Sequence, residues 1–230
     1  MSAALSFNLQ TSDGVSPIDV PISGLVIAGW TGRDEQALEK HIRELEELGV
    51  TRPKTTPIFY RVASTLLTTD HTIEVIGGDS SGEAEFVLYS TGQGLLVGLG
   101  SDHTDRKAET FGVTLSKQMC PKPVSETLWR HDDVADHWDE LVLRSWLVAG
   151  GERTLYQEGA IATMRAPDDL IGRYTGGKKA LPLGTAMFCG TLAAKGGIRG
   201  ASAFELELSD PVLGRTISHI YNVTELPVEG

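Results

Sequence analysis

The apolar residues of this chain fall mainly into short runs and alternations, the pattern that predicts β-strands. Turn-forming residues separate these runs, and glycine alone contributes 26 of the 230 residues. Residues 84–89 and 95–99 flank a Thr-Gly-Gln-Gly turn and are predicted to form a hairpin. Residues 1–23 alternate only in part, and we interpret them as an irregular arm. The predicted strands are residues 25–28, 58–62, 71–76, 84–89, 95–99, 186–189, 203–208 and 216–223.

Three segments have the spacing of apolar residues that predicts helices. The clearest covers residues 34–48, with Asp34 as a candidate cap. A second helix is predicted over residues 133–148, and a short third one begins near Pro167. Few helices among many strands predict an α+β fold that is mainly β. No repeat or long linker interrupts the pattern, so we expect a single domain over residues 1–230.

Charge and composition narrow the classes of partner and location. The formal net charge of −11 argues against a nucleic-acid partner, because an acidic surface repels phosphates. An anionic substrate stays open, since a bound cation can reverse the local field. Cys120 and Cys189 form no Cys-x-x-Cys pair and are predicted to be buried free thiols. We see no secretory signal and no apolar run of about 18 residues, so we expect a cytoplasmic protein that does not span a membrane.

Glu83 and Glu85 are the first candidates for chemistry. They open a predicted strand two positions apart, which places both carboxylates on one face. Two such charges repel each other, and a divalent cation with a preference for oxygen ligands would offset the repulsion. A solvated Glu-x-Glu pair without a metal is the common alternative, and the pair alone does not distinguish a metal site from a solvated strand face.

Two further charged groups follow along the chain. Asp102 and Arg106 come directly after the apolar strand 95–99, and Lys117 precedes Pro121. Charged residues at the end of a buried strand are typical of sites on a rigid scaffold. A lysine near a metal can hold an anionic group or polarise a carbonyl. Taken singly, these residues also fit a solvated loop and an ordinary surface lysine.

The order of these groups resembles the fumarylacetoacetate hydrolase superfamily: Glu-x-Glu, then Asp-x-x-x-Arg at a strand end, then a lysine shortly before a proline. The stretch Pro-Leu-Gly-Thr-Ala-Met-Phe-Cys-Gly-Thr at residues 182–191 is also similar to that superfamily, as is the alternating segment 204–208. The resemblance implies a mixed β-roll or barrel with a few helices. It implies a divalent cation, Mg²⁺ first and Mn²⁺ or Ca²⁺ as alternatives. The residues that it assigns to the metal are Glu83, Glu85 and Asp102; it makes Lys117 catalytic and places Arg106, Thr191 and Gly190 at the substrate.

His41 and Glu44 form a pair on the first predicted helix. They are three residues apart and therefore neighbours on one helix surface. His41 lies on the apolar stripe, where a histidine is more often a satisfied core residue. The resemblance implies a different role, because that superfamily places a His-x-x-Glu pair on a lid where it acts as a general base. We therefore expect residues 24–60 to form a strand and lid helix, and 61–225 the β-rich catalytic core.

The function that the resemblance implies is metal-dependent hydrolysis of a carbon–carbon bond. The expected substrate is a small carboxylic acid, a 2,4-dioxo acid or acylpyruvate, cleaved through a metal-bound enolate. A decarboxylase, a hydratase or dehydratase, or an isomerase of a 2-oxo acid would use the same site. A non-catalytic protein that binds small acids is the alternative from another class. The remaining alternative is a β-rich domain whose acidic residues are merely solvated. The resemblance also implies a homodimer.

Overall fold

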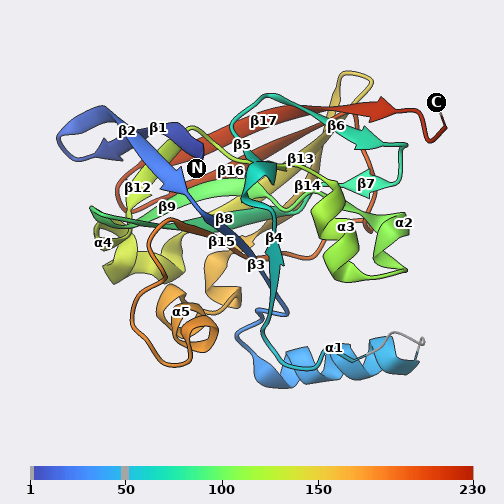
Figure 1. Cartoon of the computed structure of the whole chain (residues 1–230), viewed down its shortest axis with the longest axis horizontal. Coiled ribbons are helices and arrows are strands. Elements are labelled where there is room, and N and C mark those ends of the chain that lie inside the picture. Colours follow the sequence, from blue (N-terminus) through green and yellow to red (C-terminus); the bar gives the residue numbers. More distant parts are fainter. Residues whose placement is uncertain (1–2, 48–51, 230) are drawn as a thin grey trace.

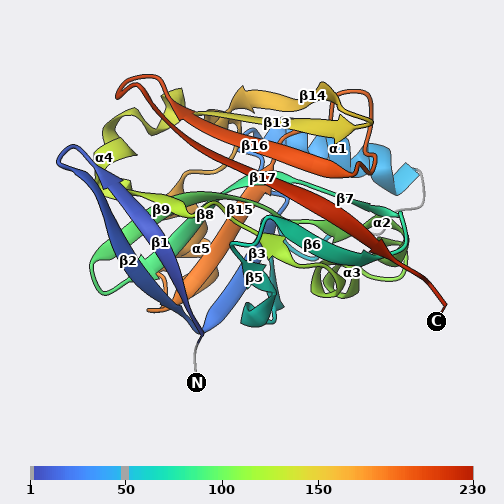
Figure 2. The same ribbon diagram turned by 90° about the horizontal axis from the view of Figure 1, so that it is seen from above.

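Two large β-sheets with helices at their edges make up most of the described part of the protein (Figure 1). The computed structural model describes residues 3–47 and 52–229. The eight-stranded sheet has the order β2 (Gly14–Ile22), β1 (Ala3–Thr11), β12 (Thr127–Arg130), β9 (Gly94–Ser101), β8 (Ala84–Thr91), β15 (Thr185–Thr191), β3 (Gly24–Gly29) and β4 (Ile58–Val62). The five-stranded sheet, seen from above in Figure 2, has the order β14 (Glu152–Ala160), β13 (Val142–Ala149), β16 (Ala203–Asp210), β17 (Arg215–Leu226) and β6 (Thr72–Ile76).

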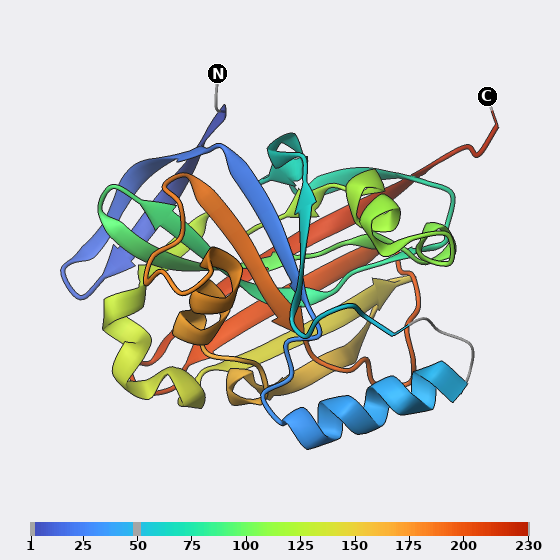
Figure 3. The same ribbon diagram turned by 60° about the horizontal axis from the view of Figure 1, so that its bottom comes forward.

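Short strands and helices complete the described part of the chain. Two small ladders pair β5 (Leu67–Thr68) with β11 (Lys122–Pro123), and β7 (Ser80–Ser81) with β10 (Thr104–Asp105). The α-helices are α1 (Glu35–Glu47), α2 (Arg106–Glu109), α3 (Val113–Met119), α4 (His131–Val134) and α5 (Pro167–Thr175). Single 3₁₀ segments cover Ser64–Leu66, Ala135–Glu140 and Ile161–Thr163. Figure 3 shows α1 along the outer edge of the molecule.

Apolar cores lie on both faces of the eight-stranded sheet. In β3, Val26 belongs to one core and Leu25 to the other, because successive side chains point to opposite faces. The first core lies between the sheets, where Phe86 of β8 and Leu206 of β16 belong to one cluster. This burial on both faces explains why several strands read as continuous apolar runs rather than alternations.

The predicted fold class is confirmed: the protein is α+β and mainly β. Within the described residues neither sheet closes on itself, so the architecture is two sheets rather than a closed barrel. The predicted strands and the first and third helices are all present, with ends that differ by a few residues. The single-domain organisation and its division at residue 60 stay predictions. No described helix is long and apolar enough to cross a membrane.

Two of the sequence interpretations were wrong. The helix predicted over residues 133–148 is instead α4, a 3₁₀ turn and the strand β13. In β13, Leu143 and Leu147 are buried while Arg144 faces outward to pair with glutamates of β14 and β16. The apolar residues of β13 are spaced in a way that also suits a helix. Hydrogen bonding to β14 and β16 on either side favours the extended conformation.

The N-terminal segment is the second correction. The described part of residues 1–23 is not an irregular arm, because β1 and β2 form one antiparallel hairpin. Its ladder runs without interruption from the Ala3–Ile22 pair to the Thr11–Gly14 pair. β1 also pairs in parallel with β12, which joins the hairpin to the large sheet. Phe7 and Val20 are buried in the second core, so the alternation in this segment is that of a half-buried strand pair.

Candidate metal centre

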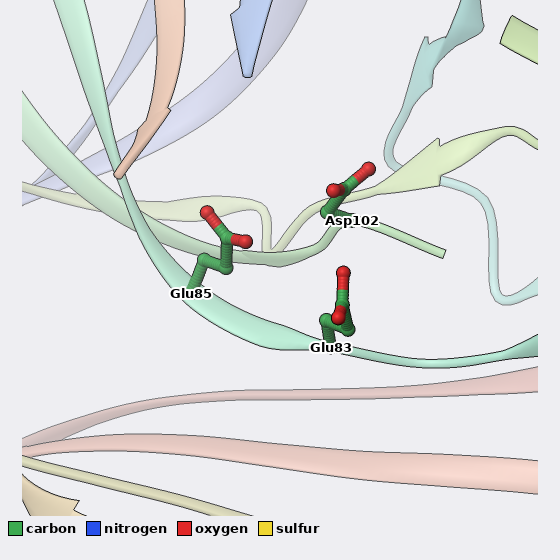
Figure 4. Close-up of side chains that lie close together, drawn as sticks. All are labelled: Glu83, Glu85 and Asp102. Atoms are coloured by element: carbon green, nitrogen blue, oxygen red, sulfur yellow. The ribbon is translucent and has the colours of Figure 1, made fainter. Parts of the chain in front are cut away.

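The β8–β9 hairpin brings three acidic side chains together. Glu83 directly precedes β8, Glu85 is its second residue, and Asp102 directly follows β9. Ala84 pairs with Ser101 at this end of the hairpin, and the amide of Asp102 donates to the carbonyl oxygen of Glu83 over 3.0 Å. One carboxylate oxygen from each of the three residues lies within 4.8 Å of the others. Figure 4 shows the three side chains around a common space.

Asp102 is completely buried and lies between two lysines. Lys117 Nζ, on α3, donates a hydrogen bond to its Oδ2, and Lys122 Nζ, on β11, lies 3.1 Å from its Oδ1. Burial opposes ionisation of this carboxyl, but the two ammonium charges outweigh burial and lower the pKa of Asp102 to about 2. Burial likewise opposes the charge on Lys117, while Asp102 and Glu83 raise its pKa overall. Lys117 is therefore a fixed cation here rather than a proton acceptor.

Glu85 is buried on the other side of the group. Its side chain is 2 % exposed, and its Oε2 accepts a hydrogen bond from the amide of Gly190 over 2.6 Å. Burial raises the pKa of Glu85 well above its usual range, and the charges of Asp102 and Glu83 add to the effect. Gly190 has φ = +102°, and a Cβ there would meet Thr31 Oγ1 at 1.8 Å, so only glycine fits this position.

Glu83 is held at the partly open side of the group. Arg106, the first residue of α2, lies 3.0 Å from Glu83 Oε1 through its Nη2, and its Nε donates to Ser81 Oγ over 2.6 Å. Lys117 Nζ lies 3.6 Å from Glu83 Oε2. The Asp105 side chain accepts from the amide of Ala108 and so caps the short helix that carries Arg106.

A network of buried polar side chains lies next to the same end of the β8–β9 hairpin. His103 Nε2 is 2.8 Å from Ser80 Oγ and its Nδ1 is 3.0 Å from the Tyr221 hydroxyl, which donates to Ser101 Oγ. Ser101 Oγ accepts from the amide of Glu83 over 3.1 Å. Burial, together with the nearby charges of Lys122 and Arg106, lowers the pKa of His103 to about 3, so the ring is neutral.

Three contributors were not predicted from the sequence. Lys122 is fully buried between Asp102 Oδ1 and the carbonyl oxygen of His103, which its Nζ contacts at 2.5 Å. Its setting between Pro121 and Pro123 was the available signal, since a lysine in an extended, otherwise apolar segment is unusual. Tyr60, whose ring centroid lies 5.9 Å from Lys117 Nζ, and Gln157, a fully hydrogen-bonded amide of β14, carried no comparable signal.

The remaining predicted site residues divide into two sets. Thr191 follows Gly190, and its hydroxyl donates to the carbonyl oxygen of Ala84 over 2.8 Å. Thr191 and Gly190 thus lie beside the acidic group, and their contact with a substrate stays a prediction. His41 and Glu44 lie on α1, but their side chains are outside the described residues, so their catalytic role also stays a prediction.

The residues of this centre fit a divalent cation. All three converging ligand groups are carboxylates, the donors that Mg²⁺, Mn²⁺ and Ca²⁺ prefer. Asp102 Oδ1 is buried and makes no hydrogen bond, in spite of the ammonium group nearby, so it retains a lone pair for a ligand. Glu85 is buried beside two other carboxylates, and a cation would remove the repulsion that opposes its ionisation.

Known structures with the same fold are found at low sequence identity. A candidate fumarylpyruvate hydrolase from Burkholderia cenocepacia is 16% identical, with a TM-score of 0.64 over 99% of this chain and 98% of that one. A candidate fumarylacetoacetate isomerase/hydrolase from Oleispira antarctica is also 16% identical, with a TM-score of 0.64 over 96% of this chain and 100% of that one. A fumarylacetoacetate hydrolase family protein of yeast is 14% identical, with a TM-score of 0.62 over 89% and 93%.

The sequence comparisons give one family. A search of curated proteins finds no match. The family model described as "Protein of unknown function (DUF2848)" matches residues 28–221, which include all three clustered carboxylates. Because that match spans most of the chain and the structural matches span nearly all of it, this protein belongs to the DUF2848 family and has the fold of the fumarylacetoacetate hydrolase family proteins.

Proposed function

We propose that this protein is a divalent-metal-dependent enzyme that cleaves a carbon–carbon bond of a 2,4-dioxo acid such as an acylpyruvate. The observation that carries the proposal is the convergence of Glu83, Glu85 and Asp102 beside the cationic Lys117. The fold neighbour from Burkholderia cenocepacia, whose name is that of a fumarylpyruvate hydrolase, supports the choice of substrate class.

The chain's own residues have distinct parts in this proposal. A bound cation would supply a Lewis acid that polarises the substrate's 2-oxo group. Glu83, Glu85 and Asp102 hold that cation, with Arg106 keeping Glu83 in place. Lys117, only 8 % exposed, lies 3.6 Å from the partly open Glu83 and stabilises negative charge that develops on the substrate. His41 with Glu44 activates water, and Thr191 with Gly190 borders the substrate's acid group.

The same centre would serve a second class of reaction. Decarboxylation, hydration, dehydration or isomerisation of a 2-oxo acid needs the same polarised carbonyl and the same cationic partner. The name of the Oleispira antarctica neighbour, which joins isomerase and hydrolase, favours isomerisation among these. Product analysis separates the classes, because hydrolysis yields two acids whereas isomerisation conserves mass. Mg²⁺ as the ion, a homodimer and a cytoplasmic location belong to the proposal as well.

The first test is thermal unfolding of metal-stripped protein with Mg²⁺ or Mn²⁺, then with oxalate, which imitates a pyruvate enolate. A native-state site that is saturated a hundredfold above its Kd stabilises by about 2.7 kcal/mol. For a chain of this size we expect a rise in Tm of about 5–10 °C. Glu83→Gln should abolish the rise, whereas Glu74→Gln, at an exposed position of β6, should keep it. No rise with any divalent ion would sink the metal centre.

Turnover is tested separately with acylpyruvates and 2-oxo acids, following release of pyruvate. Metal-dependent release that is lost in Lys117→Met would support hydrolysis. A protein that shows the metal-dependent and oxalate-dependent rise in Tm, but no turnover of any 2-oxo or 2,4-dioxo acid, would be a small-acid-binding protein instead.

A further inference from the structure

Gln157 is a buried amide that a β-bulge turns into the space between the sheets. It lies in β14 and is 2 % exposed. Ser145 of β13 pairs with Gln157 and Trp146 pairs with Leu155, so Tyr156 is an extra residue between two paired positions. A bulge of this kind re-aims the side chains beside it. Tyr156 and Gln157 are both buried in consequence, although consecutive strand residues ordinarily face opposite sides.

All four hydrogen-bonding positions of this amide are used. Its Oε1 accepts from the backbone amide of Ala84 over 3.0 Å and from Ser145 Oγ over 2.8 Å. Its Nε2 donates to Thr191 Oγ1 over 2.7 Å and to the carbonyl oxygen of Leu192 over 2.6 Å. A backbone N–H can only donate and a carbonyl can only accept, so these partners define the orientation of the amide.

One of those bonds, together with a hydrogen bond from Thr191, holds the residue between the two glutamates. Ala84 lies between Glu83 and Glu85; its amide is bound by Gln157, and its carbonyl oxygen is bound by Thr191 Oγ1. The ladder between β8 and β15 is irregular here, with a register shift between Phe188 and Thr191. The shift lets Gly190 turn its amide to Glu85, and the Gln157–Thr191 pair satisfies the backbone groups of Ala84 at that break.

We propose that Gln157 is a positioning residue that sets the separation and direction of the Glu83 and Glu85 carboxylates, and thereby the affinity of the centre for its cation. The proposal rests on the metal centre of the proposed function. Gln157 touches neither carboxylate; it acts through the Ala84 peptide, whose orientation determines where the side chains on either side point. Its amide is neutral, so it shapes the centre without changing its charge.

The test is titration of metal-stripped protein with Mn²⁺, in which the electron paramagnetic resonance signal of free Mn²⁺ reports how much is bound. The titration is done at a temperature where circular dichroism shows that each variant is folded. Gln157→Leu removes all four hydrogen bonds at similar volume, and we expect its Kd for Mn²⁺ to rise about tenfold or more. Ser145→Ala is the matched control. It removes one of the two donors to Gln157 Oε1 but leaves the bonds of Gln157 to Ala84 and Thr191, so its Kd should stay within about twofold of the parent protein.

Thr191 supplies a second pair of variants in case Gln157→Leu does not fold. Thr191→Val removes the hydroxyl that completes the support of Ala84 and should weaken Mn²⁺ binding, whereas Thr191→Ser keeps the hydroxyl and should restore it. Equal Mn²⁺ affinity in the parent, Gln157→Leu and Thr191→Val would overturn the role of Gln157 and leave the metal centre standing. Weakening in Ser145→Ala as large as in Gln157→Leu would also overturn it, as a general loosening of the core. A parent protein that binds no Mn²⁺ would overturn the metal centre itself.

Discussion

Asp102 is completely buried between the ammonium groups of Lys117 and Lys122, and this arrangement shows how single residues shape the centre. The two lysines differ in setting. Lys122 has no exposed side-chain surface and also donates to the carbonyl oxygen of His103, whereas Lys117 is slightly exposed and also faces Glu83. Lys122 is therefore a structural counter-ion, and Lys117 is the cation that we propose meets a substrate.

Replacement of Lys122 should cost much more stability than loss of a surface ion pair. Lys122→Met leaves a buried carboxylate oxygen uncompensated, and removing one partner of a buried pair costs about 3–5 kcal/mol. Lys195→Met breaks a 3.1 Å pair with Glu158 in which both side chains are substantially exposed, and should cost below about 1 kcal/mol. Urea unfolding measures both, and equal losses would contradict the structural role of Lys122.

His219 should make the protein less stable in mild acid. Burial, with a contribution from His71, lowers its pKa from 6.5 to about 4, and its Nε2 has no hydrogen-bond partner among the described residues. Because the folded pKa is the lower one, the stabilisation is complete above pH 6.5 and is lost progressively as the pH falls towards 4. The loss should reach about 1–3 kcal/mol.

His219→Phe removes this titration, so unfolding free energies measured across that pH range should fall less steeply than in the parent protein. The comparison uses the difference between the two proteins, because other groups titrate in both. Parallel pH profiles would show that His219 gains no stability from staying neutral.

At the scale of elements, the β8–β9 hairpin carries the acidic group and α1 carries the predicted His41–Glu44 pair. α1 is tied down at its first turn. Arg165 Nη2 lies 3.0 Å from Glu35, and Arg33 donates to the carbonyl oxygen of Met164 and to Asp139. Asp34 Oδ1 accepts from the amides of Gln36 and Ala37, as expected of an N-cap. The start of the helix is thus held by charge and capping.

Loss of the cap should loosen α1 without loosening the sheets. Asp34→Ala removes two hydrogen bonds to otherwise unsatisfied amides and should cost about 1 kcal/mol of helix stability. Hydrogen exchange should quicken in α1 while β8 and β15 keep their protection. Asp34→Ser retains a capping oxygen and should exchange like the parent protein. Unchanged exchange in Asp34→Ala would show that the contacts of Arg33 and Arg165 alone determine the start of the helix.

At the scale of the whole molecule, the N-terminal hairpin is part of the core. Phe7 is 2 % exposed, and its ring meets that of Tyr89 on β8 edge-on at 5.3 Å between centroids. The hairpin therefore contributes side chains to the core on the face of the large sheet away from the five-stranded sheet. Figure 2 shows it joined to the sheet at one side of the molecule.

Phe7→Ala should therefore destabilise the whole protein. Removing a buried aromatic ring from a packed core costs about 3–5 kcal/mol. Val15→Ala, at a position of the same hairpin that is 65 % exposed, should stay within about 0.5 kcal/mol of the parent. Urea unfolding measures both. Similar small losses in the two variants would mean that the hairpin is only loosely attached.

Local pattern determined a large part of the fold. Period-two and continuous apolar runs predicted the central strands, because the faces that strands bury are recorded residue by residue in the sequence. The order of the charged groups, through its resemblance to the fumarylacetoacetate hydrolase superfamily, also predicted which carboxylates would meet. The hairpin turn between β8 and β9 requires that Glu85 and Asp102 end at the same edge, so their proximity follows from local chemistry.

Only the tertiary structure decided the rest. Residues 142–149 suit a helix or a strand by pattern, and the neighbours β14 and β16 select the strand by supplying partners for its backbone. Lys122 belongs to the centre because its charge offsets that of a distant buried carboxylate, and Gln157 because a distant peptide needs its hydrogen bond. Such needs arise when separate segments are buried together. A polar residue's own neighbours in sequence therefore do not reveal them, and the packed molecule does.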